Sequence, residues 1–228
     1  MKQDVALTNH NCSWEKVLGH RYEPRSDSIS LNQRICDPEL NTKRLILSAA
    51  FSVFDPLSLC LPVTVQGRLL IREMWIRGID WDEPIPEELQ HRWRLLAGEL
   101  SELHSISFDR QGLSEYVGVD LLIFSDASKK AYGFSVYAVG RGSSSLIFAK
   151  AKVAPLKTKT LPTLELLAVF LAIKCLSNIL KTYQKMTFRN LYLAVDAQIV
   201  LSWLLSKQTN NKSIFVKHRL KDITQMEE

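Results

Sequence analysis

The chain has 228 residues and a formal net charge of +5, and 46% of its residues are hydrophobic and 23% charged. These values are ordinary for a soluble globular protein, and the length accommodates one large or two small domains. Four widely spaced cysteines without a CxxC pair argue against a disulfide framework or a zinc site. There is no signal peptide and no apolar run that predicts a membrane span, so we expect an intracellular protein, cytoplasmic or nuclear, without a membrane partner.

Charge is divided unevenly along the chain. Residues 1–117 carry 13 basic and 17 acidic residues, whereas residues 118–228 carry 16 basic and 7 acidic residues. The two parts therefore have net charges of −4 and +9. A basic domain of this kind is typical of proteins that act on a polyanion, although scattered lysines also occur on ordinary solvated surfaces.

The first half predicts a small hairpin followed by helices. Residues 1–41 are polar and rich in turn residues, and their strand-like stretches lie at 17–22 and 28–31. Residues 42–117 predict a mainly helical segment, because apolar residues recur there at helical spacing. Its helices are expected to start near Thr42, to run from about 63 to 77 and from about 86 to 103, and to pack on one another without entering the sheet of the second half. Their net negative charge argues against direct phosphate binding.

The second half, residues 118–228, alternates between strands and helices. Strands are expected at 119–125, 132–139, 145–153 and 190–195, and helices at 162–181, 197–206 and from 215 to 226. Three strands joined by short loops, followed by helix, strand and helix, predict an α/β fold: a mixed sheet with flanking helices.

Three carboxylates stand at element ends in this half. Asp126 and Asp196 close two apolar strands, and Glu165 is expected in the first turn of the helix that begins near Pro162. If the two strand ends and the helix start converge, the carboxylates would bind Mg²⁺ or Mn²⁺, and paired ions of this kind hydrolyse phosphodiesters. The other interpretation is three ordinary acids, because Asp and Glu also favour the first helical turn.

Polar residues beside Asp126 have two interpretations as well. Ser125 and Ser128 could support Asp126 by hydrogen bonding, or could form a local turn. Lys129 and Lys130 could touch phosphates, or could belong to a solvated loop.

Several ordered motifs resemble the BEL/Pao-type retrotransposon polyproteins over nearly the whole chain. In the second half the motifs that resemble their ribonuclease H-like domain are Phe124-Ser-Asp-Ala-Ser128, Lys130-Ala-Tyr-Gly133, Ala149-Lys-Ala-Lys-Val-Ala-Pro-Leu156 and Leu161-Pro-Thr-Leu-Glu-Leu-Leu167. In the first half the motifs that resemble the thumb/connection segment before that domain are Val17-Leu-Gly19, Thr42-Lys-Arg44, Phe54-Asp-Pro-Leu57, Pro62-Val-Thr64 and Ile79-Asp-Trp-Asp82.

The resemblance implies a ribonuclease H-like fold preceded by a mainly helical connection segment. It also implies an endonuclease that uses two Mg²⁺ ions to cut the RNA strand of RNA–DNA hybrids, with nucleic acid as partner and no small-molecule substrate. Asp126, Glu165 and Asp196 match the family's first three catalytic, metal-binding carboxylates. The order Asp–Glu–Asp favours a ribonuclease over an integrase, which shares the fold but generally places its glutamate last.

The chain departs from the family pattern in four places. Ser58, Thr163 and Ala197 stand where the family usually has glycine, arginine and serine. The family's fourth metal-binding aspartate follows the Val216-Lys-His-Arg219 segment, and Asp222 is too close to that segment to match it. We therefore expect a C-terminally truncated domain, from a polyprotein fragment or an element-derived gene product, with weak or no cleavage activity. The alternative is a catalytically inactive remnant that at most binds nucleic acid through its basic half.

Overall fold

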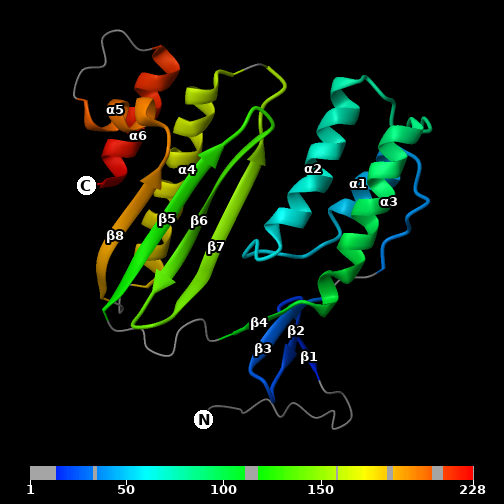
Figure 1. The fold of residues 1–228 in the computed structure, drawn as a ribbon, viewed down its shortest axis with the longest axis horizontal. Coiled ribbons are helices and arrows are strands. Elements are labelled where there is room, and N and C mark those ends of the chain that lie inside the picture. The colour runs from blue at the N-terminus through cyan, green and yellow to red at the C-terminus, as the bar shows by residue number, and fades with distance from the viewer. Residues whose placement is uncertain are drawn as a thin grey trace, which may run out of the picture.

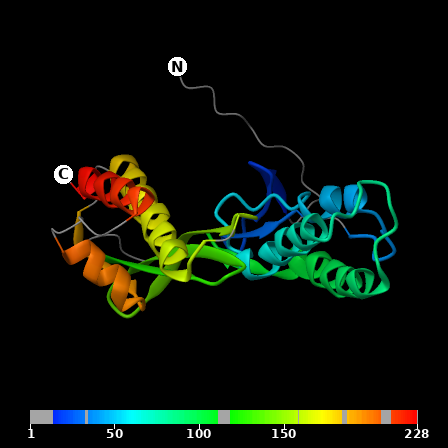
Figure 2. The same cartoon turned by 90° about the horizontal axis from the view of Figure 1, so that it is seen from above.

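The computed structural model describes residues 14–32, 35–110, 118–157, 159–183, 187–206 and 213–227. Two parts of the molecule lie side by side along its longest axis (Figures 1 and 2). One holds the N-terminal helices and a small sheet, and the other a larger sheet with helices packed on it.

The small sheet is antiparallel and has the strand order β1-β2-β3-β4. Its strands are β1 (Glu15–Val17), β2 (His20–Glu23), β3 (Ser28–Leu31) and β4 (Ser107–Asp109). The prediction of one strand over residues 17–22 was wrong, because the backbone reverses at Leu18 and Gly19, where φ is 48° and 90°. Strand β4 was not predicted, and only its pairing with β3 identifies it as a strand.

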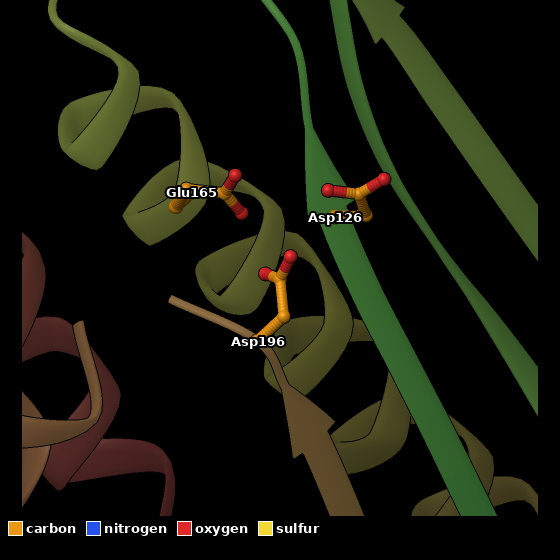
Figure 3. A group of neighbouring side chains, drawn as sticks. All are labelled: Asp126, Glu165 and Asp196. Carbon is orange, nitrogen blue, oxygen red and sulfur yellow. The ribbon is translucent and has the colours of Figure 1, made fainter. Parts of the chain in front are cut away.

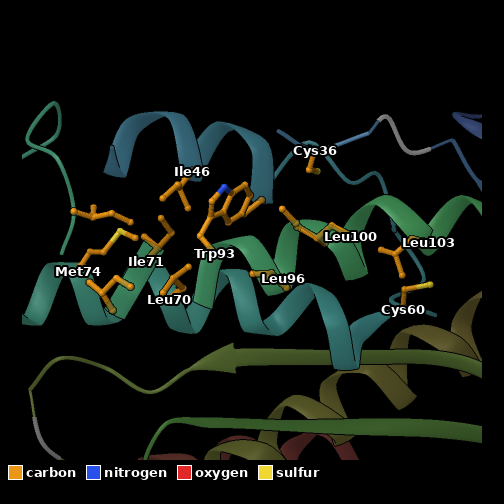
Figure 4. Packing of buried hydrophobic residues seen from close by; sticks show 14 of the residues in the cluster. Cys36, Ile46, Cys60, Leu70, Ile71, Met74, Trp93, Leu96, Leu100 and Leu103 are labelled. Carbon is orange, nitrogen blue, oxygen red and sulfur yellow. The ribbon is translucent and has the colours of Figure 1, made fainter. Parts of the chain in front are cut away.

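The N-terminal helices form one core with the segment that precedes them. These helices are α1 (Lys43–Ala50), α2 (Leu61–Ile76), α3 (Glu87–Glu102) and the 3₁₀ turn η1 (Leu103–Ser105). Trp93 of α3 is completely buried at the centre of this core (Figure 4). Its indole N–H donates a hydrogen bond of 3.0 Å to the carbonyl of Asp37. Leu31 and Cys36 belong to the same apolar cluster, so the hairpin and the helices share one interior.

The larger sheet has the strand order β7-β6-β5-β8 and confirms the predicted α/β class. Strands β5, β6 and β7 are antiparallel neighbours, and β8 runs parallel to β5. Its strands are β5 (Val119–Ala127), β6 (Ala131–Val139), β7 (Ser144–Val153) and β8 (Phe188–Val195). The helices of this part are α4 (Leu161–Thr182), α5 (Gln198–Leu205) and α6 (Ile214–Glu227).

Helix α4 supplies the core of the larger sheet. It packs across β5 and β6, where every second residue of β5 from Val119 to Ile123 is buried against it. By length and composition α4 could cross a membrane, contrary to the expectation that no segment would reach that length. Its contacts with β5, β6 and α6 account for the apolar composition, since a core helix of this kind is apolar on most sides.

Helix α2 joins the two parts by covering the outer edge of β7. The Arg68 and Arg72 guanidinium groups donate hydrogen bonds of 3.0 and 2.9 Å to the carbonyls of Ala151 and Ala154. Beside them, the amide of Ala149 donates a hydrogen bond of 3.1 Å to the carbonyl of Leu57. The N-terminal helices therefore stay outside the sheet, as expected, but they also pack against it, which the sequence did not indicate.

Candidate metal centre

Three carboxylates from three separate elements meet at one end of the larger sheet. One oxygen from each of Asp126, Glu165 and Asp196 lies within 4.8 Å of the others. Figure 3 shows Asp126 on β5, Glu165 on α4 and Asp196 just beyond β8, with all three side chains pointing toward one another. The structure thus brings together all three residues that the sequence singled out.

The strand pairing explains why the two aspartates meet. Strands β5 and β8 are parallel neighbours, and Ser125 lies opposite Val195 in their register. The residues that follow, Asp126 near the end of β5 and Asp196 just beyond β8, therefore lie side by side at the same end of the sheet. Helix α4 begins at Leu161 and lies across β5 and β6, which carries Glu165 to the same place.

Glu165 differs from the other two carboxylates in burial. It is the fifth residue of α4, so the predicted first-turn position was wrong and the first turn contains no acid. Its residue exposure is 5%, whereas Asp126 and Asp196 are exposed. The usual preference of acids for the first helical turn therefore does not explain a glutamate here.

Burial also changes the proton affinity of Glu165. Loss of solvent, together with the negative charges of Asp126 and Asp196, raises the pKa of its carboxyl to about 7. Its Oε2 atom is buried and accepts no hydrogen bond from any residue that the structure describes. A buried carboxylate oxygen without a partner is costly, and a cation between the three side chains would supply that partner.

The donor set fits a hard divalent cation. All three side chains offer carboxylate oxygens, which are the preferred ligands of Mg²⁺ and Mn²⁺. Two of the groups are open to solvent, and the third approaches from the protein interior. This arrangement leaves one side of the cluster open to solvent.

The polar residues next to Asp126 are divided between two roles. The Ser128 hydroxyl accepts hydrogen bonds from the amides of Lys130 and Ala131, at 3.2 and 3.1 Å, so it forms the turn between β5 and β6. The Ser125 side chain is buried, and its Oγ has no hydrogen-bond partner within the described part of the chain. Neither hydroxyl has a described hydrogen bond to Asp126.

A groove of about 390 Å³ runs from Asp126 between the sheet and helix α2. Gly133 belongs to its lining, and a Cβ atom there would lie 2.7 Å from the carbonyl oxygen of Lys150. Pro62 and Val65 of α2 form part of its wall. The sequence did not indicate this wall, because only the folded chain brings α2 next to β5 and β6.

The unusual residues of the family pattern have identifiable places in the structure. Ser58 has a φ of 57°, in the left-handed region that glycine adopts most readily. Ala197 is the N-cap of α5 and provides no side-chain hydrogen bond. Thr163 shares a hydrogen bond of 2.8 Å with Thr160 at the start of α4. Asp222 accepts a hydrogen bond of 2.7 Å from Arg219, so it is already paired.

The chain is similar to solved structures of a viral reverse transcriptase. The structure of a foamy viral protease-reverse transcriptase in complex with an RNA/DNA hybrid matches 91% of this chain and 27% of that chain, with a TM-score of 0.51 and 12% sequence identity. The same enzyme in complex with double-stranded DNA matches 94% of this chain and 43% of that chain, with a TM-score of 0.49 and 12% identity. This chain therefore spans less than half the length of either structure, and at this identity the first match shows the fold alone. No curated protein matches the chain.

A match to a family model identifies the family of this chain. The model of the Pao retrotransposon-like RNaseH-like domain matches residues 42–197, which is more than half of the chain. The matched region includes Asp126, Glu165 and Asp196. The chain belongs to the Pao retrotransposon-like RNaseH-like domain family.

Proposed function

We propose that this domain hydrolyses phosphodiester bonds in the RNA strand of RNA–DNA hybrids. The observation that carries the proposal is the convergence of Asp126, Glu165 and Asp196, with a buried Glu165 oxygen that lacks a partner among the described residues. Family membership and the hybrid bound by the foamy viral enzyme support the choice of substrate.

The three carboxylates would hold two divalent cations, Mg²⁺ or Mn²⁺. When bound, such ions supply a water nucleophile at neutral pH and neutralise charge on the leaving 3′ oxygen. Asp126 and Asp196 face solvent, where a phosphate can approach them. Glu165 approaches from the protein interior, where little water competes for its oxygens.

A hybrid-cleavage assay tests the proposal. A labelled RNA–DNA hybrid is incubated with the protein in Mg²⁺ and in Mn²⁺, and the RNA fragments are resolved. We expect fragments that end in a 3′ hydroxyl, because the 3′ oxygen is the leaving group. Asp126→Asn and Glu165→Gln should abolish this product, whereas the control Asp222→Asn should retain it, because Asp222 pairs with Arg219 outside the cluster.

The outcomes separate the proposal from its alternative. Hybrid binding without cleavage in either metal would support a domain that only binds nucleic acid. Cleavage that persists in Asp126→Asn would show that these carboxylates are not the catalytic groups.

A further inference from the structure

Three exposed lysines near the carboxylates in the chain have no ion pair with an acid that the structure describes. Asp120 pairs with Arg189 and Asp222 pairs with Arg219, and the three carboxylates of the cluster are held together at the sheet end. Both of these ion pairs use arginine. The exposed lysines nearest the cluster in the chain, Lys129, Lys130 and Lys157, form no ion pair with any acid that the structure describes.

Two of these lysines belong to a hydrogen-bonded turn that follows Asp126. The turn follows Asp126 directly, and the amide of Ser128 donates a hydrogen bond of 2.7 Å to the carbonyl of Ala131. The Ser128 hydroxyl accepts further hydrogen bonds from two amides of the same turn. The backbone that carries Lys129 and Lys130 is therefore held by hydrogen bonds of the turn itself.

The third lysine follows β7 in a segment that is attached to this turn. The amide of Ala154 donates a hydrogen bond of 2.8 Å to the carbonyl of Lys130, and Lys157 stands three residues further along the chain. The carbonyl of Ala154 in turn accepts the hydrogen bond from Arg72 of α2. Hydrogen bonds thus join the segment after β7 to the turn and to helix α2 of the N-terminal part.

We propose that Lys129, Lys130 and Lys157 form a cationic rim that binds the phosphate backbone of a nucleic acid next to the carboxylates. Lysine side chains neutralise phosphates as point charges, and such contacts position a strand without reading its sequence. The carboxylates repel a polyanion when no cation is bound, so fixed positive charge beside them would hold the strand close to the cluster. This inference rests on the proposed function and identifies the residues that would bind the phosphate backbone of the substrate at that site.

Salt-dependent binding tests the rim. The affinity of the full chain for a labelled RNA–DNA hybrid is measured in Ca²⁺ between about 50 and about 200 mM salt, where each phosphate contact contributes about 0.9 to the logarithmic slope for a duplex. The triple variant Lys129→Ala, Lys130→Ala, Lys157→Ala should bind roughly tenfold more weakly at the lower salt, with a slope smaller by about 2 to 3.

The matched control removes three positive charges elsewhere. It combines Arg141→Ala, in the exposed turn at the other end of β6, with Lys174→Ala and Lys181→Ala on α4. Its slope should stay within error of the unchanged protein. Equal losses in both triple variants, an unchanged affinity in the rim variant, or no hybrid binding by the unchanged protein would each overturn the proposal.

A second measurement keeps the rim separate from the proposed catalysis. Mn²⁺ binding should be the same in the rim variant and the unchanged protein, and absent in Asp126→Asn. If Asp126 controls metal binding and cleavage while the rim variant binds the hybrid normally, only the rim is refuted. If neither metal binding nor cleavage occurs but hybrid binding depends on the rim, the proposed catalysis fails and the rim stands.

Discussion

Arg72 of α2 donates a hydrogen bond of 2.9 Å to the backbone carbonyl of Ala154, just beyond strand β7. The neighbouring Arg68 makes the same kind of contact with Ala151. A sheet edge with unpaired carbonyls is prone to wrong pairing, and these arginines cover it.

We expect the double variant Arg68→Leu, Arg72→Leu to lose about 1 to 3 kcal/mol of unfolding free energy, since both carbonyls lose charged donors. Urea unfolding measures the loss, and hydrogen exchange should quicken at the Ala149 amide on the same edge. Arg94→Leu is the control, because the described ion pairs of Arg94, with Glu39 and Glu87, lie at the surface, and such pairs contribute about 1 kcal/mol or less. Similar losses in the control would contradict a specific role for the β7 edge.

The stability of the metal-free protein should decrease as pH rises through the range in which Glu165 ionises. Its pKa is raised from 4.5 to about 7 in the folded protein, so the folded state holds this proton more tightly than the unfolded state. The unfolding free energy should therefore fall between about pH 4.5 and about pH 7, by at most roughly 3 kcal/mol.

Denaturant unfolding in EDTA at several pH values measures this slope, and Glu165→Gln should flatten it. Asp82 does not contribute to this slope, because Arg44 lowers the pKa of its carboxyl. The contribution of Asp82 to the unfolding free energy therefore changes only at more acidic pH. The same decline in unfolding free energy in Glu165→Gln would assign the effect to another group.

Divalent cations should raise the melting temperature through the carboxylate cluster. A ligand that binds only the folded state at 100 times its Kd stabilises that state by about 2.7 kcal/mol. Asp126→Asn should abolish the rise with Mn²⁺ and should increase the metal-free melting temperature, because it removes one of the charges that repel Glu165. Differential scanning calorimetry provides both values, and a Mn²⁺-dependent rise that survives in Asp126→Asn would place the ion elsewhere.

Ala197→Ser should stabilise the chain by about 1 kcal/mol. Ala197 is the N-cap of α5 with an extended backbone, a φ of −74° and a ψ of 95°, but its side chain has no oxygen to accept a hydrogen bond from the first amides of the helix. Serine would supply that acceptor. Ala197→Cys is nearly the same size as the serine variant but accepts hydrogen bonds weakly, so thermal unfolding should show little gain for it.

Ser58→Gly should also be stabilising, by roughly 0.5 to 1 kcal/mol. The φ of 57° at Ser58 places its Cβ close to the backbone, and glycine removes this strain. Ser58→Ala retains the Cβ and should give no gain in urea unfolding. A gain from alanine equal to that from glycine would show that the hydroxyl, and not the backbone conformation, is unfavourable.

The local sequence predicted most strands of the larger sheet and the helices of the same part. Runs such as residues 119–125 are apolar and bounded by turn residues, so periodicity and breakers were enough to locate them. Short elements with little apolar content were misjudged. The expected strand over 17–22 contains the turn at Leu18, and β4 has only three residues, so its pairing with β3 alone makes it a strand.

The sequence by itself determined the identity of the three carboxylates and the position of Asp126 and Asp196 at strand ends, because strand boundaries are local properties. Only the tertiary structure decided that Glu165 is buried, since burial depends on how α4 lies across the sheet. The same packing leaves its Oε2 atom without a hydrogen-bond partner among the described residues. The same holds for the edge of β7, which α2 covers from about 80 residues away in the chain. Contacts between segments so distant in sequence leave no local pattern, and they arise from the packing of complete elements.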